Sequence, residues 1–328
     1  MKFDKVCIYG AGAIGGWIGA ALAQAGCRLN AVARGATLDA LRNDGLSLMR
    51  GDVRTRVPVN AVADPQALGP QDLVVVAVKA PALAGVAAQI APLIGPDTVV
   101  LTAMNGVPWW FLEGGFGGAL AGTRLTAIDP EGAIAAAIPS ANVIGGVVHA
   151  SCSLDAPGVV RHHFGNGLIV GEPSGEATER VHALADLLTR AGIDARVSPQ
   201  IQKDVWYKLW GNMTVNPISA LTGATTDKIL DDDLLRGFIS TVMLEAREIG
   251  ARIGIPITDT PEDRHQVTRK LGAFKTSMLQ DVEAGRAVEL DALVGAVREL
   301  GQRNGVATPF TDALLGLARV QARRLGLY

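Results

Sequence analysis

A short apolar segment followed by a glycine-rich turn opens the chain and constrains its fold more than any other feature. Residues 5–9 read Lys-Val-Cys-Ile-Tyr, residues 10–15 read Gly-Ala-Gly-Ala-Ile-Gly, and an alanine-rich helical pattern continues to Ala25. A strand, a tight turn and a helix in this order are typical of the first unit of a dinucleotide-binding sheet. The alternative is a glycine-rich strand-to-helix turn without a ligand.

Each position of this turn has a physical role in the predicted site. Gly10 would form the tight turn, Gly12 would let the backbone approach a pyrophosphate, and Gly15 would let the helix pack closely on the strand. The first N–H groups of the helix would point toward the phosphates. We therefore include Ala13 and Ile14 with the three glycines in the predicted cofactor site.

Composition limits the functional classes that remain open. The chain has 328 residues, 48% of them hydrophobic, which is enough for two domains with sizeable cores. Thirty basic and 32 acidic residues give a formal net charge of -2 with no basic block, so no nucleic-acid partner is expected. The sequence has neither a long uncharged apolar run nor a secretory leader pattern, which favours a cytoplasmic protein that does not bind a membrane.

Cysteines and histidines do not predict a metal site. Three cysteines, at positions 7, 27 and 152, are widely spaced and form no Cys-x-x-Cys motif, so they are interpreted as small core residues. His149, His162 and His163 have no accompanying cluster of acids or cysteines. We expect a structural role for them, with residues 161–165 on a β-hairpin or at a strand edge, and no metal.

Short apolar strands alternate with helical patterns in the first half of the chain. The predicted strands are Val6–Tyr9, Leu29–Ala33, Leu73–Val78, Thr98–Thr102, Val143–Val148 and Leu168–Val170, and the predicted helices are Ile14–Ala25, Thr37–Asn43 and Pro81–Leu93. This alternation favours a parallel sheet with helices on both faces. From about Glu176 onward the pattern becomes mostly amphipathic helices, most clearly over Leu234–Gly250 and Leu290–Gly301.

The change of pattern predicts an α/β protein with two domains. We expect a doubly wound parallel sheet over residues 1–172 and an all-helical domain over residues 173–328, with the sequence Gly-Glu-Pro-Ser-Gly at 171–175 as the hinge. In folds of this kind ligands bind at the carboxyl edge of the sheet, so we expect a cleft there. The helices also offer surfaces for a homodimer, which no single residue establishes.

The second predicted strand bears on the choice of cofactor. NAD enzymes usually carry an Asp or Glu after this strand to bind the ribose 2′-hydroxyl. Here the strand ends in Arg34 and no acid is present. Because a guanidinium suits a 2′-phosphate through charge-assisted hydrogen bonds, NADPH is predicted in preference to NADH. The alternative is a solvated surface arginine.

A polar row crosses an otherwise apolar segment in the second half. Lys208, Asn212 and Asn216 are spaced four residues apart, so on a helix they share one face. Polar groups on an apolar segment need partners, which a substrate would provide. Pro217 disfavours helical geometry at Asn216, so we expect the row to end at a kink. The alternative is a solvent-facing stripe on an amphipathic helix.

Taken together, separated motifs make the sequence resemble the ketopantoate reductase (2-dehydropantoate 2-reductase) family over nearly its whole length. These motifs are Gly-Ala-Gly-Ala-Ile-Gly at 10–15, Ala-Arg-Gly at 33–35, Val-Lys-Ala at 78–80, Asn-Gly at 105–106, Lys-Leu-x-x-Asn-x-x-x-Asn-Pro at 208–217, Ser-Met-Leu-Gln-Asp at 277–281 and Glu-Leu-Asp at 289–291. The resemblance implies a Rossmann domain followed by a helical domain. It also implies NADPH-dependent reduction of a 2-keto acid, first of all ketopantoate to (R)-pantoate in pantothenate biosynthesis.

By that resemblance, Lys208 is the proton donor to the carbonyl, and Glu289 is the acid that contacts the substrate. Asn212, Asn216 and Ser277 match substrate-binding positions. Lys79 and Asn105 match a pair in the nucleotide domain that faces the cleft, where both would serve the cofactor and Asn105 also the substrate. Arg34 matches the ligand of the 2′-phosphate. The residue types suit the chemistry, because a positioned ammonium can stabilise the charge that develops on a ketone oxygen and supply the proton.

One segment departs from the family pattern. Val107-Pro108-Trp109-Trp110-Phe111 and the glycine-rich stretch after it are longer than the usual link. If residues 109–132 lined the site, they would favour a bulkier or more apolar substrate, although adjacent tryptophans more often serve packing. Two alternatives therefore stay open, a D-2-hydroxyacid dehydrogenase or ketone reductase on the same scaffold and an NADPH-sensing module without catalysis.

Overall fold

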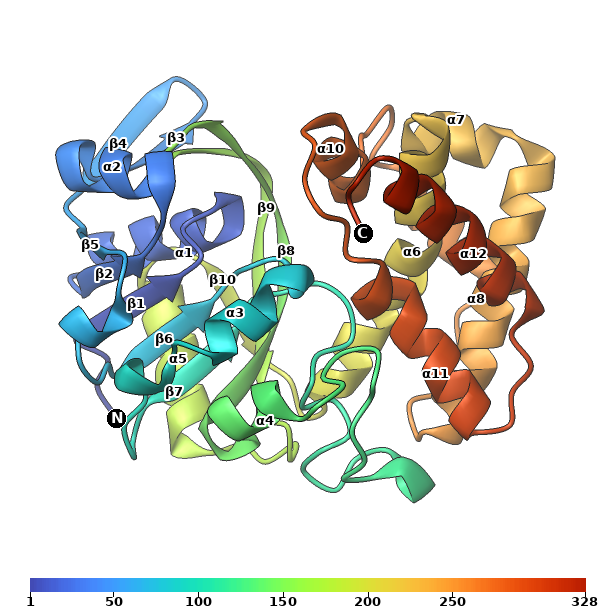
Figure 1. Cartoon of the computed structure of the whole chain (residues 1–328), viewed down its shortest axis with the longest axis horizontal. Coiled ribbons are helices and arrows are strands. Elements are labelled where there is room, and N and C mark those ends of the chain that lie inside the picture. The colour runs from blue at the N-terminus through green and yellow to red at the C-terminus, as the bar shows by residue number, and fades with distance from the viewer. The chain divides into compact units, whose positions relative to one another are not determined.

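The structure, a computed structural model, describes every residue from Met1 to Tyr328 and divides into two compact units (Figure 1). The first unit comprises residues 1–104 and 132–204, and the second comprises residues 105–131 and 205–328. This division differs from the boundary that we expected between residues 172 and 173. The reason is that the segment after residue 172 adds a helix and a further strand to the sheet of the first unit.

Six strands of the first unit form a continuous parallel run in its sheet. In spatial order they are β5 (Asn60–Val62), β2 (Arg28–Val32), β1 (Lys5–Tyr9), β6 (Leu73–Val76), β7 (Val99–Thr102) and β8 (Val143–Ala156). Counted among themselves along the chain, they follow the order 3-2-1-4-5-6 of a doubly wound dinucleotide-binding sheet. The predicted α/β class and its parallel sheet are confirmed.

The other edge of the sheet was largely missed. β8 turns back into β9 (Val159–Gly171) as a long antiparallel hairpin, and three more strands extend from it: β3 (Leu46–Arg50), β4 (Val53–Val57) and β10 (Asp194–Val197). These three strands are short, and β4 and β10 carry several exposed side chains, so no apolar run marks them. Residues 161–165 lie on this hairpin, as predicted.

Helices cover the sheet of the first unit. They are α1 (Ala13–Gln24), α2 (Gly35–Asp44), α3 (Leu83–Ala87), α4 (Ala133–Ala137) and α5 (Glu179–Arg190). The helix predicted over Pro81–Leu93 is wrong in extent, because only α3 is α-helical there and 3-10 turns flank it. Pro81 and Pro92 lack the N–H that a continuous helix needs.

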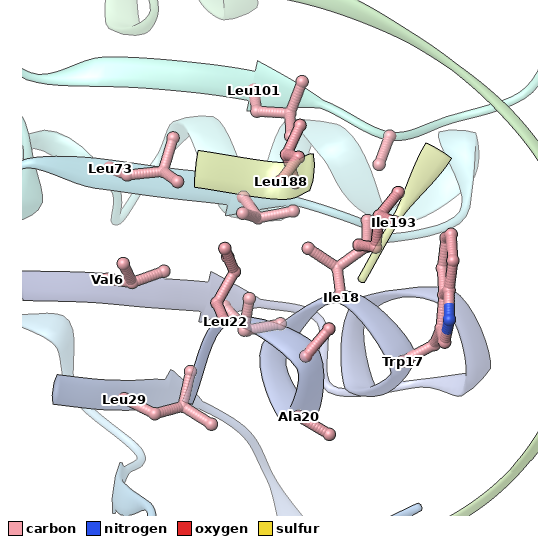
Figure 2. Packing of buried hydrophobic residues seen from close by; sticks show 14 of the residues in the cluster. Val6, Trp17, Ile18, Ala20, Leu22, Leu29, Leu73, Leu101, Leu188 and Ile193 are labelled. Atoms are coloured by element: carbon pink, nitrogen blue, oxygen red, sulfur yellow. The ribbon is translucent and has the colours of Figure 1, made fainter. Parts of the chain in front are cut away.

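The core of the first unit lies between the sheet and its helices (Figure 2). Val6, Leu73 and Leu101 from three neighbouring strands are fully buried and belong to one apolar cluster with Ile18 and Leu22 of α1. Burying a side chain of this size contributes roughly 1.5–3 kcal/mol. This packing fixes α1 against the strands and thereby fixes the glycine turn that precedes it.

The second unit is helical, as the sequence predicts. Its helices are α6 (Ile201–Thr222, which begins in the first unit), α7 (Thr226–Asp231), α8 (Asp233–Arg252), α9 (Pro261–Arg269), α10 (Ser277–Glu283), α11 (Ala296–Arg303) and α12 (Pro309–Arg324) (Figure 1). A π-helical turn over Asp291–Gly295 leads directly into α11. None of the helices combines the length and the apolar character that crossing a membrane would require.

The prediction that Pro217 moves Asn216 away from helical geometry is wrong. α6 continues through Pro217 to Thr222, although a proline inside a helix removes one backbone hydrogen bond. Residues 213–220 of α6 are all buried, so packing on every side stabilises the helix beyond the proline. Asn216 therefore keeps helical geometry, and the polar row stays on one face.

Candidate active site

The glycine turn of the first unit contains two positions that only glycine can occupy. Gly10 has φ of +101°, and a Cβ there would lie 2.9 Å from the carbonyl oxygen of Ala77. A Cβ at Gly15 would lie 2.2 Å from the carbonyl oxygen of Gly10 and 2.9 Å from Ile8. Two of the three glycines are therefore required for the turn itself and for the close approach of α1 to β1.

Gly12 is different, because nothing fills the space beside it. It caps the N-terminus of α1 without a side-chain hydrogen bond, and a Cβ there would meet no atom within 4 Å. The open space beside the backbone at the start of a helix suits an anion, which the helix dipole and the N–H groups beginning at Ala13 and Ile14 would attract. The turn thus fits the pyrophosphate of a dinucleotide.

Arg34 and Lys79 follow strands that flank β1 on either side. Arg34 comes after β2 as the residue that caps α2, and its exposed guanidinium Nη2 donates a hydrogen bond of 3.1 Å to Oε1 of Gln89. Lys79 comes after β6 and is partly buried. Because β2, β1 and β6 are parallel neighbours, both residues belong to the same carboxyl edge of the sheet as the glycine turn.

The predicted polar row is present on α6 in the second unit. Lys208 and Asn212 are partly buried, and Asn216 is only 7% exposed. Apolar side chains on the rest of the helix fix its orientation, among them Trp210, which is buried and whose Nε1 donates a hydrogen bond of 2.7 Å to the carbonyl oxygen of Met243. The row is therefore held by a packed helix, and it is not a solvent-facing stripe.

The acidity of Lys208 is strongly perturbed. Loss of hydration lowers the pKa of its ammonium from 10.5 to about 8, while the negative charge of Glu289 opposes this shift. Glu289 is itself 5% exposed and stands just before the π-helical turn. A lysine that can lose its proton near neutral pH, next to a buried carboxylate, has the properties of a general acid.

Asn105 and Ser277 both belong to the second unit, so Asn105 does not lie in the nucleotide domain, where the resemblance placed it. The backbone after Asn105 packs on the π-helical turn, since Val107 N–H donates a hydrogen bond of 2.9 Å to the carbonyl oxygen of Ala292. A Cβ at Gly106 would lie 2.6 Å from that same oxygen, so the close approach requires glycine. Ser277 is the first residue of α10 and is partly buried.

The aromatic segment after Asn105 packs inside the protein. Trp109, Trp110 and Phe111 are at most 5% exposed, and the ring of Phe111 stacks on that of Trp206 with 6.0 Å between centroids. Further along, both oxygens of Glu299 accept backbone N–H groups of residues 126 and 127. The segment is therefore anchored to the second unit, to which residues 105–131 belong.

The histidines of β9 have structural contacts. His162 stacks on Trp17 with 6.2 Å between ring centroids, and Nε2 of His163 lies 2.8 Å from the hydroxyl of Ser153. No three or more His, Cys, Asp or Glu side chains gather anywhere in the structure in a way that would hold a metal ion. Gln89 was not among the predicted site residues, and its contact with Arg34 joins residues from two separate segments.

The open glycine turn and the strand order of the first unit are typical of a dinucleotide-dependent enzyme. Comparisons with known proteins then identify its family. The model described as "Ketopantoate reductase PanE/ApbA" matches residues 6–113, and the model for the C terminal part of the same family matches residues 200–322. The chain belongs to the ketopantoate reductase family.

Individual relatives agree over the whole chain. A 2-dehydropantoate 2-reductase of Mesorhizobium japonicum is 48% identical over 325 residues, which cover 99% of both sequences. A crystal structure from Ralstonia solanacearum MolK2, provisionally named a ketopantoate reductase, has a TM-score of 0.96 at 55% identity and covers 100% of both chains. A D-mandelate dehydrogenase solved with NADH and anilino(oxo)acetate has a TM-score of 0.81 at 23% identity, covering 99% of this chain and 100% of that one, and shares the fold alone.

Proposed function

We propose that this chain reduces 2-dehydropantoate (ketopantoate) to (R)-pantoate with NADPH, and that Lys208 is the general acid. The observation that carries the proposal is the position of Lys208, half-buried on the polar face of α6 and within reach of the charge of the buried Glu289, where loss of hydration lowers its pKa. The family membership and the 48% identical 2-dehydropantoate 2-reductase support the same reaction.

The first unit supplies the cofactor site in this proposal. Gly10, Gly12 and Gly15 form the turn, and the first N–H groups of α1 bind the pyrophosphate. Arg34 binds the 2′-phosphate of the adenosine ribose, because β2 ends without an acid and a guanidinium forms strong hydrogen bonds to phosphate. Lys79 belongs to the same set, and Asn105, a residue of the second unit, is assigned to the cofactor as well. When bound, a reduced nicotinamide supplies a hydride to the ketone carbon.

The second unit supplies the proton. As the ketone is reduced, negative charge grows on its oxygen, and the Lys208 ammonium stabilises this charge and transfers its proton to it. Below a pH of about 8 most of the Lys208 population carries that proton. Glu289 keeps the ammonium charged against the loss of hydration and orients it toward the substrate.

Neutral polar groups bind the rest of the substrate. Asn105, Asn212, Asn216 and Ser277 carry amide and hydroxyl donors that suit the carboxylate and hydroxyl of a small keto acid. Because none of the four is charged, they can bind the substrate without altering the charge balance between Lys208 and Glu289.

The packing of the aromatic segment after Asn105 argues against a bulkier substrate. Trp109, Trp110 and Phe111 are packed side chains, so they are not free to line a larger site. A sensing module without catalysis would have no need of a lysine whose pKa is tuned toward neutrality.

A steady-state assay tests the proposal. NADPH oxidation is followed with 2-dehydropantoate, with 2-keto acids that carry larger apolar groups, and with NADH in place of NADPH. We expect the highest kcat/KM for 2-dehydropantoate with NADPH. Turnover that favours a bulky keto acid would indicate the dehydrogenase alternative, and NADPH binding without oxidation by any keto acid would indicate a sensor.

A further inference from the structure

A hydrogen-bonded bridge crosses the carboxyl end of β1, between the segments that follow its two neighbouring strands. Arg34 follows β2 and Gln89 follows α3, the helix after β6. The guanidinium Nη2 of Arg34 donates to Oε1 of Gln89 at 3.1 Å. The hydroxyl of Tyr9, the last residue of β1, points to the same oxygen at 3.5 Å. The three side chains therefore form one cluster at the end of the central strand.

Gln89 is well placed to hold Arg34, because its own backbone is fixed. Its N–H donates to the carbonyl oxygen of Val86 at 3.0 Å, and the next residue, Ile90, is fully buried. Arg34, in contrast, is exposed and makes no ion pair with any acid. A long exposed side chain is mobile unless a fixed partner restricts it, and binding then has to overcome that mobility.

The amide of Gln89 orients Arg34 without neutralising it. A guanidinium has five N–H donors, so one bond to Gln89 leaves the others available for a phosphate. A carboxylate at the same position would cancel the positive charge and repel an anion. Tyr9 strengthens the arrangement, because two donors that point at Oε1 fix which way the amide faces. The pKa of Tyr9 is raised by its burial and lowered in part by the Arg34 charge, in keeping with their proximity.

We propose that Gln89 is a positioning residue that sets the preference for NADPH over NADH by holding Arg34 across the end of β1. The inference rests on the proposed function, which assigns the 2′-phosphate to Arg34. It predicts that the charge and the hydrogen-bonding capacity of residue 89 change affinity for the phosphorylated cofactor selectively, because the two cofactors differ only in that phosphate.

Direct binding of the two cofactors to the full chain tests this inference. The Kd values of NADPH and NADH are measured by titration for the wild type, Gln89→Glu and Gln89→Leu. We expect Gln89→Glu to raise the Kd of NADPH about tenfold or more, and Gln89→Leu to raise it about threefold, with NADH changed less than about twofold. Gln66→Glu is the matched control, since it adds the same charge to an exposed site of the same unit.

A coupling experiment separates orientation from a general charge effect. In an Arg34→Ala background, Gln89→Leu should no longer change the NADPH Kd, because the side chain that it orients is absent. The inference about Gln89 would be wrong if neither Gln89 variant changed the ratio of the NADPH and NADH Kd values. If Arg34→Ala then still removed the preference for NADPH, the proposed cofactor would stand. If the wild type bound both cofactors equally, the NADPH assignment itself would fail.

Discussion

The pH dependence of the reaction follows from the environment of Lys208. Loss of hydration lowers the pKa of its ammonium to about 8, which lies about 2.5 pH units below its usual 10.5, although the Glu289 charge acts in the opposite direction. One pH unit corresponds to about 1.4 kcal/mol, so keeping this proton in the folded protein costs roughly 3 kcal/mol more than in water. The protein thus maintains an ammonium that releases its proton readily.

Raising the pH through about 8 should therefore remove the proton donor. Roughly nine-tenths of Lys208 is protonated one unit below its pKa and roughly one-tenth one unit above it. We expect kcat/KM for the keto acid to be constant below this value and to fall about tenfold per pH unit above it, because kcat/KM reports the enzyme before the keto acid binds. Oxidation of the hydroxy acid should show the opposite trend, because that direction needs neutral lysine.

The assay is NADPH oxidation at saturating NADPH with the keto acid well below its KM, from about pH 6 to about pH 10, with circular dichroism at each pH as a check of folding. Lys208→Arg is the informative variant, since a guanidinium stays protonated over this range and any residual activity should lack the alkaline fall. A wild-type profile that stays flat to pH 10, with the protein folded, would show that Lys208 does not titrate in this range or does not supply the proton.

Protein stability provides an independent readout of the same shift. Because the pKa of Lys208 is lower in the folded state, the unfolded state binds more protons between about pH 8 and pH 10.5. The free energy of unfolding of the wild type should therefore rise across this window relative to Lys208→Ala, by up to roughly 3 kcal/mol. Denaturant unfolding at both ends of the window measures the difference, and parallel curves for the two proteins would contradict it.

Three further predictions follow from the structure. Gly15→Ala should lower Tm and weaken cofactor binding in a titration, because its Cβ has no space, whereas Gly85→Ala, with no atom within 4 Å, should be neutral or stabilising. Glu289→Gln should shift the alkaline limit of kcat/KM to lower pH, because the charge that raises the lysine pKa is lost. Glu299→Gln should lower Tm at neutral pH and lower it less in acid. Burial alone would raise the Glu299 pKa, but the hydrogen bonds from backbone N–H groups lower it overall. The carboxylate therefore stabilises the folded state at neutral pH, and this stabilisation is lost as the pH falls.

Local patterns in the sequence predict the first unit well. The glycine turn, α1 and the strands β1, β2, β6 and β7 agree with the predictions to within two residues, because each is a strongly apolar or alanine-rich run with a clear end. The polar row of α6 also follows from spacing alone, since four-residue steps share a helix face. The family resemblance is confirmed by the comparisons.

The sequence could not predict features that depend on contacts between distant segments. Residues 105–131 belong to the second unit because Gly106 packs on Ala292 and Glu299 binds the backbone near residue 126, and no local pattern encodes these contacts. Pro217 also shows the effect of distant contacts. The low helix propensity of proline predicts an interruption there, but burial of the surrounding residues keeps α6 helical. Gln89 was missed because an ordinary glutamine gains its role only when β2 and β6 lie on either side of β1.

Whether Lys208 supplies the proton during reduction can be measured in a single-turnover experiment. Enzyme saturated with NADPH is mixed rapidly with 2-dehydropantoate, and oxidation of the bound cofactor is followed for the wild type, Lys208→Ala and the exposed control Lys203→Ala. We predict that Lys208→Ala binds NADPH normally but oxidises it on the order of 10²–10⁴ times more slowly, while Lys203→Ala matches the wild type. Equal rates for Lys208→Ala and the wild type would contradict the account.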